Sequence, residues 1–285
     1  MIHKLSIRNF KSIRELDLDC RRVNVFIGEP NAGKTNILEA LSMECFGALS
    51  RLKSVCRIER FVDLIKDQDE TNKVEIGINT HRIELSILDK RVLRLDWHHQ
   101  SQMDPLAESD MAVFIHADGK LEIPALNKDR TLDYLEYGTH YYLFDPDAVQ
   151  RSGETAVLEA PYGQNLASYL AADKQARITL SSLFPTGRYR PTIDRSQDAV
   201  LLAHEEDGTL ITLPFKSSSE TLRRMLFYYL ALQSHEHGTI IFDEPEAHSF
   251  PPYTKTLAER IALDDRGNQF FLTTHSPYML DSLLS

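Results

Sequence analysis

The sequence predicts an α/β fold in which segments from both ends of the chain pair in one parallel sheet. Near the start, the apolar run 23–27 indicates a strand, and a turn that contains glycine separates it from residues with helical spacing. Near the end, an apolar helix over 222–232 precedes two patterns of buried strands, 239–242 and 270–273. Strands that alternate with helices favour a parallel sheet, so we expect these distant strands to be neighbours.

Between the two ends, shorter segments predict antiparallel strands. Two of them, 73–78 and 83–87, alternate cleanly between apolar and polar residues, and a polar step separates them. This pattern predicts an antiparallel meander, to which 91–95 adds a further strand. Similar alternation at 5–7 and 16–18 predicts two more strands at the start of the chain.

The rest of the middle region is less regular. The polar segment 98–110 is expected to be a loop, and 141–144 a strand that ends at Asp145-Pro146-Asp147. Residues 166–183 have the pattern of one helix. A cluster of tyrosines is interpreted as part of the core rather than as a ligand cage. Its members are Tyr134, Tyr137, Tyr141 and Tyr142.

Composition excludes several classes of protein. No apolar run is long enough to cross a bilayer, and the alternating start of the chain lacks the apolar centre of a signal peptide. Cys20, Cys45 and Cys56 lack metal-ligand spacing and are expected to be reduced thiols of a cytoplasmic protein. The net charge of −10 argues against a surface that coats nucleic acid unspecifically. Residues 1–60 nevertheless hold 11 Lys and Arg against 7 Asp and Glu, so a basic face on this part of the chain is the alternative.

The turn after residue 27 carries the pattern of a phosphate-binding loop. It matches G-x-x-x-x-G-K-[ST] in full and lies between a strand pattern and a helix pattern, as the mechanism requires. The matching residues are Gly28, Glu29, Pro30, Asn31, Ala32, Gly33, Lys34 and Thr35. The glycines let backbone N–H groups converge on phosphate oxygens, Lys34 neutralises the β- and γ-phosphates, and Thr35 ligates Mg²⁺. The alternative is a glycine-rich turn with a solvated lysine.

Two further motifs stand at the ends of predicted strands. Asp243 and Glu244 follow the apolar run 240–242, which places Asp243 at the carboxyl edge of the sheet, where nucleotides bind in α/β folds. Asp243 can hold Mg²⁺ through water, and Glu244 can polarise the attacking water. His275 follows the next strand, where it can reach the γ-phosphate side of the site. A structural histidine is the alternative.

Together these motifs resemble those of an ABC-class ATPase of the RecF/SMC-like branch. Within that branch, the chain is most similar to the AAA-type ATPases of the OLD (overcoming lysogenization defect) family. The resemblance covers both ends of the chain well and the middle in outline. The segments that carry it are 5–13, 28–40, 161–167, 243–248 and 274–277.

The resemblance refines the predicted fold class. It implies an α/β, ABC-type P-loop ATPase head with a mixed-sheet lobe, an antiparallel β meander and a helical lobe. We expect a single two-lobed domain over 1–285, which has enough residues for two buried cores. The nucleotide-binding core is expected to come from 1–44 and 196–285, and the antiparallel strands and helical lobe from 45–195.

The resemblance also implies roles for individual residues. Lys34, Glu244 and His275 are the expected catalytic residues. Lys11 is expected near the nucleotide phosphates, and Asn36 in the nucleotide site, because both lie in the matching segments.

A second set of residues is implied less directly. Residues 217–221 occupy the place of the ABC signature, and Ser218 is the candidate for a phosphate contact in trans, with a helix N-cap serine as the alternative. The family usually has glycine where this chain has Glu220, so Glu220 either turns outward or weakens ATP-driven closure. Phe250-Pro251 is a further departure from the family pattern. Gln150 is the candidate for the Q-loop glutamine and for a further metal ligand.

The function implied by the resemblance is Mg²⁺-dependent hydrolysis of ATP, with ATP and Mg²⁺ as cofactors. The cycle would drive association and release of an ATP-bridged homodimer. The expected partner is a protein effector such as a nuclease, on another chain or in a C-terminal domain, with DNA as a further partner and no membrane. DNA repair or anti-phage defence is the implied setting. The alternatives are an ATP-binding assembly switch with little hydrolysis and the nucleotide-binding subunit of a transporter.

Overall fold

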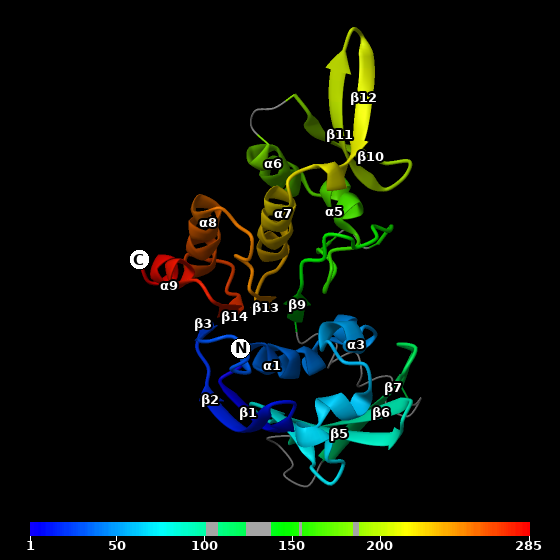
Figure 1. Ribbon diagram of the computed structural model, residues 1–285, viewed down its shortest axis with the longest axis vertical. Helices are drawn as coiled ribbons and strands as arrows, with labels where there is room; N and C mark the ends of the chain where they lie inside the picture. Colours follow the sequence, from blue (N-terminus) through cyan, green and yellow to red (C-terminus); the bar gives the residue numbers. More distant parts are fainter. Residues whose placement is uncertain (101–107, 124–137, 154–155, 185–187) are drawn as a thin grey trace. The chain divides into compact units, whose positions relative to one another are not determined.

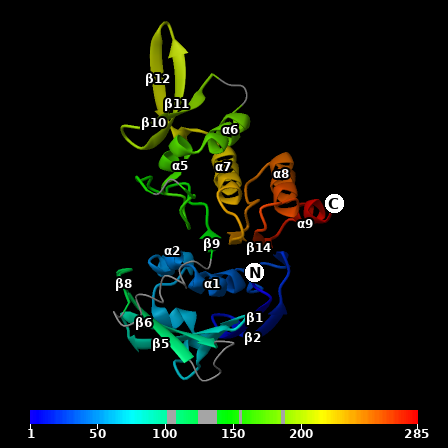
Figure 2. The same cartoon turned by 180° about the vertical axis from the view of Figure 1, so that it is seen from behind.

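The computed structural model shown in Figures 1 and 2 describes residues 1–100, 108–123, 138–153, 156–184 and 188–285. The chain divides into two compact units. The first unit contains residues 1–141, 237–243 and 269–275. The second unit contains residues 142–236, 244–268 and 276–285. The first unit therefore shares 1–44, 237–243 and 269–275 with the predicted nucleotide-binding core, and the prediction of one domain over the whole chain remains a prediction.

The first unit contains the predicted parallel sheet, built from distant parts of the chain. Its strand order is β3-β14-β13-β9. The strands are β3 (Val23–Ile27), β14 (Gln269–Thr274), β13 (Thr239–Asp243) and β9 (Thr139–Tyr142). The pairs β3–β14 and β14–β13 are parallel, and every residue of β13 and β14 is buried. Two apolar runs that lie far from β3 in the sequence thus complete its sheet, as predicted.

The second sheet of the first unit is antiparallel and has the order β2-β1-β4-β5-β6-β7-β8. Its strands are β1 (Lys4–Phe10), β2 (Ile13–Asp19), β4 (Val74–Ile78), β5 (His81–Asp89), β6 (Val92–Gln100), β7 (Glu108–His116) and β8 (Leu121–Glu122). The predicted meander is confirmed. The two strands predicted at the start of the chain join it, because β1 pairs with both β2 and β4.

Helix α1 (Lys34–Leu41) contacts β13 and β14 of the parallel sheet and β1 of the antiparallel sheet, so it links the two sheets. Leu38, Ala40 and Leu41 have no exposed surface and form its core-facing side. Short helical segments follow α1 in the same unit. They are η1 (Ser42–Glu44), α2 (Phe46–Leu49), α3 (Leu52–Val55), η2 (Phe61–Leu64) and η3 (Lys66–Gln68).

The loop predicted for the polar segment 98–110 is wrong at both of its ends. Residues 98–100 belong to β6 and 108–110 to β7, and they face one another in the antiparallel register. Strand pairing depends on backbone hydrogen bonds, so polar side chains do not end a strand. Residues 101–107 lie outside the described part of the chain.

The second unit is mainly helical and carries a small antiparallel sheet. Its helices are α5 (Leu166–Ala172), α6 (Lys174–Leu183), α7 (Glu220–Gln233), α8 (Pro251–Ala262) and α9 (Pro277–Leu284), with the short helix η5 (Phe215–Ser217). The sheet order is β10 (Arg190–Asp194), β11 (Ala199–Glu206) and β12 (Thr209–Pro214). Helix α7 confirms the predicted helix over 222–232. Figure 1 shows β11 and β12 as a long hairpin.

The predicted helix over 166–183 is two helices rather than one. The backbone leaves the helical region at Asp173, which has φ −95° and ψ 123°. Its carboxylate accepts a hydrogen bond from Ala176 N (2.5 Å) and caps the start of α6. A capping aspartate therefore interrupts an apolar pattern that looked continuous.

The strand predicted at 141–144 also ends early. β9 stops at Tyr142, because Leu143 N donates to Pro161 O (2.9 Å) instead of to a neighbouring strand. Tyr141 and Tyr142 are buried, as predicted for core residues. The other two tyrosines of the predicted cluster, Tyr134 and Tyr137, lie outside the described residues.

Gln269, the first residue of β14, ties the start of the chain to the parallel sheet. Its side chain accepts from Ile2 N (2.7 Å) and donates to Ile2 O (2.7 Å) and Arg21 O (2.8 Å). Because Gln269 is almost fully buried, Gln269→Ala removes the partner of Ile2 N and Ile2 O, whereas Arg21 O keeps the hydrogen bond from Asn24 Nδ2 (2.6 Å). We expect the free energy of unfolding, measured with a denaturant, to fall by about 2 kcal/mol. Gln175→Ala, at an exposed position of α6, is the control, and equal losses in both variants would contradict this account.

Candidate functional site

The loop between β3 and α1 requires a glycine at Gly33. This residue precedes α1 and has φ 86°, in the left-handed region. A Cβ atom at Gly33 would lie 2.9 Å from Ser12 Oγ, which is too close for a carbon–oxygen contact. The preceding residues 28–32 are exposed. The chain therefore presents an accessible loop at the N-terminus of a helix, an arrangement that suits phosphate groups.

Lys34, the first residue of α1, is buried and turns back over this loop. Its Nζ donates to Gly28 O (2.9 Å) and Glu29 O (2.7 Å). The ammonium group thus lies beside the loop backbone, where the positive end of the helix dipole also favours an anion. Asn36, in the same first turn of α1, donates from Nδ2 to Ser12 Oγ (2.7 Å) and so fixes the loop after β1 against α1.

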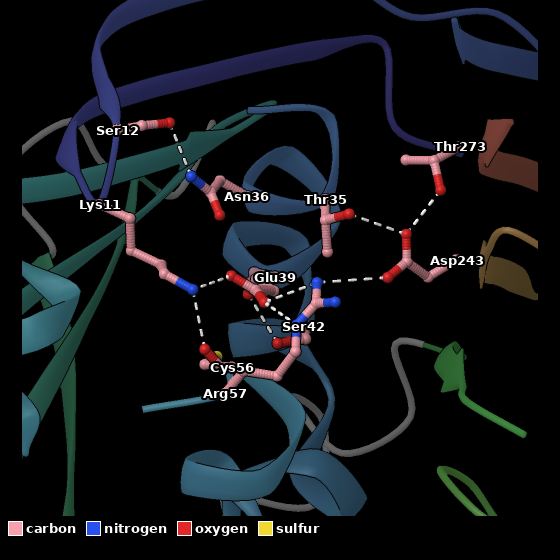
Figure 3. A network of polar contacts seen from close by, with 10 residues as sticks. All are labelled: Lys11, Ser12, Thr35, Asn36, Glu39, Ser42, Cys56, Arg57, Asp243 and Thr273. Carbon is pink, nitrogen blue, oxygen red and sulfur yellow. Dashed lines mark hydrogen bonds and ion pairs between the residues drawn. The ribbon is translucent and has the colours of Figure 1, made fainter. Parts of the chain in front are cut away.

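The loop motif and the carboxylate motif meet in the first unit, although 208 residues separate them (Figure 3). Thr35 Oγ1 donates to Asp243 Oδ1 (3.0 Å), and Thr273 Oγ1 donates to the same oxygen (2.5 Å). The side chain of Asp243 is 7% exposed. A hydroxyl and a carboxylate are the oxygen ligands that Mg²⁺ prefers, so the residues present fit this ion.

Three strands end at the same edge of the parallel sheet. In the register, Asp243 is paired with Thr273, and Thr274 with Ile27. The phosphate loop follows Ile27, and His275, which is exposed, follows Thr274. Glu244 is the residue directly after Asp243 and has φ 46°. The edge therefore carries the sequence motifs at the carboxyl ends of parallel strands, where α/β folds bind nucleotides.

Lys11 contacts α1 through a buried glutamate. Its Nζ donates to Glu39 Oε2 (2.6 Å) and to Cys56 O (2.8 Å). The Glu39 side chain has no exposed surface, and burial raises the pKa of Glu39, an effect that Lys11 partly opposes. The predicted contact between Lys11 and the nucleotide phosphates remains a prediction.

Arg57 joins this cluster to the carboxylate of Asp243. Its Nη2 lies 3.2 Å from Glu39 Oε1 and 3.3 Å from Asp243 Oδ2 (Figure 3). Burial lowers the pKa of Arg57, but the charges of Glu39 and Asp243 outweigh this and raise it. Sequence reasoning missed Glu39 and Arg57, and it gave no role to Thr273, which donates to Asp243.

In the second unit, Ser218 and Glu220 lie at the start of α7. Ser218 Oγ donates to Phe215 O (2.7 Å), and the N-cap residue of α7 is Ser219. Glu220 forms an ion pair with Arg224 one turn along the helix (3.2 Å) and so turns along α7. The trans contact of Ser218 remains a prediction.

Gln150 is exposed in the loop after β9 and lines a pocket of about 310 Å³ in the second unit. Phe144 and Phe227 contribute to the walls of this pocket. The predicted role of Gln150 as a metal ligand remains a prediction.

Residues 1–143 match the family model described as AAA ATPase domain. The chain belongs to this ATPase domain family. No curated protein sequence matches the chain. None of the described helices is long and apolar enough to cross a membrane.

Solved structures show the fold of this AAA ATPase domain chain. One is an SMC head bound to the C-winged helix domain of ScpA, with 15% identity and a TM-score of 0.56. Another is an Smc head domain with an extended coiled coil, bound to the C-terminal domain of ScpA derived from Pyrococcus furiosus, with 13% identity and a TM-score of 0.54. Each match covers 99% of this chain and 91% of the other. The predicted α/β head fold, with a parallel sheet, an antiparallel sheet and helices, is confirmed, whereas a particular closeness to the OLD family remains a prediction.

Proposed function

We propose that this ATPase domain binds ATP with Mg²⁺ and hydrolyses it to ADP and phosphate. The contact between Thr35 and Asp243 carries the proposal, because it joins a complete phosphate-loop motif to the acidic end of a buried strand. Lys34 lies on the same helix and supplies a buried ammonium at the loop. Positioning and electrostatic stabilisation provide most of the catalysis in phosphoryl transfer, and these residues offer both.

Each residue has a distinct role in this proposal. Thr35 and Asp243 hold Mg²⁺, with Gln150 as a further ligand, and the bound ion neutralises charge on the phosphates. Lys34 binds the β- and γ-phosphates together with the loop N–H groups. Glu244 orients and polarises the attacking water, and His275 acts on the γ-phosphate side.

The cycle proposed for this chemistry is association and release of two heads in the cytoplasm. Lys34 and Glu244 of one subunit would act with Ser218 of the partner subunit on one nucleotide. Two SMC heads of the same fold are solved with domains of ScpA bound, which supports a protein partner for this head as well. The net charge of −10 also favours a protein over unspecific contact with DNA. We propose an effector such as a nuclease, in repair or anti-phage defence.

An ATP-binding switch with little hydrolysis is the second candidate, and it rested on Glu220 in the signature segment. The ion pair of Glu220 with Arg224 directs this carboxylate along α7. That orientation of Glu220 supports the hydrolytic cycle as the first candidate.

Steady-state release of phosphate from ATP, with and without Mg²⁺, tests the proposal directly. We expect turnover that requires Mg²⁺, together with a rise in mass by light scattering when ATP is added to the 32.6 kDa chain. ATP binding and dimerisation without turnover would support the switch instead. An absence of ATP binding would refute both.

A further inference from the structure

Arg57 is held in an unusual backbone conformation at the end of α3. It follows the helix cap Cys56 and has φ 51°, in the left-handed region that favours glycine. Arg57 N donates to Ser54 O (3.3 Å) and Ile58 N donates to Lys53 O (2.9 Å). These are the two bonds of a Schellman motif, in which glycine is the common residue at this position. An arginine in this left-handed conformation is less stable than a glycine would be, so contacts of its side chain are expected to hold it there.

The guanidinium group bridges two carboxylates that lie on different elements. It contacts Glu39 on α1 and Asp243 at the end of β13, at 3.2 and 3.3 Å (Figure 3). The two acidic side chains are 0% and 7% exposed, whereas the Arg57 side chain is 57% exposed. The cation can therefore leave for solvent, but the carboxylates cannot.

The charges of this cluster balance without any added ion. Glu39 and Asp243 supply two carboxylates, and Lys11 and Arg57 supply two cations. Lys11 is the less exposed cation, at 18%, and also donates to Cys56 O, so it is anchored by two partners. A divalent cation at Asp243 would add two positive charges close to Arg57, and the repulsion between them falls only slowly with distance in a partly buried site.

We propose that Arg57 is the resident counter-ion of the metal site, and that it competes with a divalent cation for Asp243. This inference rests on the proposed function, because it concerns the same metal site. A divalent cation alone meets a neutral cluster and binds weakly. The complex of Mg²⁺ with a nucleoside triphosphate carries a net negative charge, so Arg57 does not repel it as it repels the bare ion, and its metal can take Asp243 from Arg57. Metal binding is thereby coupled to nucleotide binding.

Binding of Mn²⁺ in the absence of nucleotide, followed by the electron paramagnetic resonance signal of the free ion, tests this coupling. Arg57→Ala removes one positive charge beside Asp243, so we expect Mn²⁺ to bind at least about tenfold more tightly than to the wild type. Arg57→Gly should give the same gain with a residue suited to φ 51°. Arg57→Lys keeps the charge and should stay close to the wild type.

A matched control is Arg60→Ala, because Arg60 is 63% exposed and pairs with Asp63 outside this cluster. Adding Asp243→Asn to Arg57→Ala should abolish the gain and so locate the bound Mn²⁺. Equal Mn²⁺ affinities in the wild type, Arg57→Ala and Arg57→Gly, with circular dichroism unchanged, would overturn the inference. Weaker ATP binding by Arg57→Ala without a change in Mn²⁺ affinity would also overturn it. Failure of the wild type to bind ATP would instead refute the proposed function, since the Mn²⁺ measurement uses no nucleotide.

Discussion

Lys34→Ala is expected to lower the affinity for ATP by at least about 100-fold and to abolish turnover. Lys34 supplies a buried ammonium at the start of α1, beside the backbone of residues 28 and 29. Each hydrogen bond between charged groups contributes about 1.5–3 kcal/mol, and two such bonds to phosphate account for a loss of this size. The loop N–H groups remain in the variant, so residual weak binding is expected. Titration with a fluorescent ATP analogue measures the change.

Lys90→Ala is the control for this substitution, because Lys90 lies in the exposed turn between β5 and β6. It removes the same charge and should leave ATP affinity and turnover at the wild-type level. Circular dichroism would show whether Lys34→Ala keeps the fold. We expect the fold to be kept, because the two hydrogen bonds of Lys34 are to carbonyls of an exposed loop. Unchanged ATP affinity in a folded Lys34→Ala protein would mean that nucleotide does not bind at this loop.

The parallel sheet was predictable because its signals are local and strong. The runs that became β13 and β14 each contain three consecutive buried apolar residues, 240–242 and 270–272, and polar residues follow each run directly. The phosphate loop has fixed spacing, so its place between β3 and α1 followed from the sequence. Two motifs 208 residues apart could be expected to meet because parallel strands carry their carboxyl ends to one edge.

Arg57 and Glu39 could not be found in the same way. Arg57 lies in irregular chain after a four-residue helix, and its position depends on a left-handed conformation. An arginine in the sequence does not predict that conformation, whereas a glycine would. Glu39 carried a signal that was available. It follows Thr35 by one helical turn and stands among the buried residues of α1, so a partner for its charge could have been sought.

The three-stranded sheet β10–β12 was missed for a related reason. Its strands alternate only partly, and several of their residues are exposed, so the apolar pattern is weak. Asp207 and Gly208 have φ 52° and 74°, and an Asp-Gly pair between two extended runs is a strong hairpin signal. Turn chemistry rather than apolar alternation would have predicted this hairpin.

Glu244→Gln is expected to lower the rate of ATP hydrolysis by at least about 100-fold, because a general base contributes about 10²–10⁴ to such a step. Glutamine keeps the shape of the side chain but cannot accept the proton of the attacking water. ATP affinity should stay within about threefold of the wild type, since Glu244 acts on water and not on the phosphates of the ground state. Blocked hydrolysis should also prevent release, so light scattering in ATP should show a species with twice the 32.6 kDa of one chain.

The matched control for this variant is Glu259→Gln, an exposed position of α8 that pairs with Lys255 one turn away. It makes the same chemical change on the surface and should hydrolyse ATP at the wild-type rate. Turnover in Glu244→Gln close to that of the wild type would assign the base to another residue, with His275 the first to replace. Loss of ATP binding along with turnover would mean that Glu244 supports the nucleotide site rather than the chemical step. A trapped dimer with intact ATP binding would instead support both the catalytic role of Glu244 and the proposed cycle, because only blocked hydrolysis leaves ATP bound in both sites.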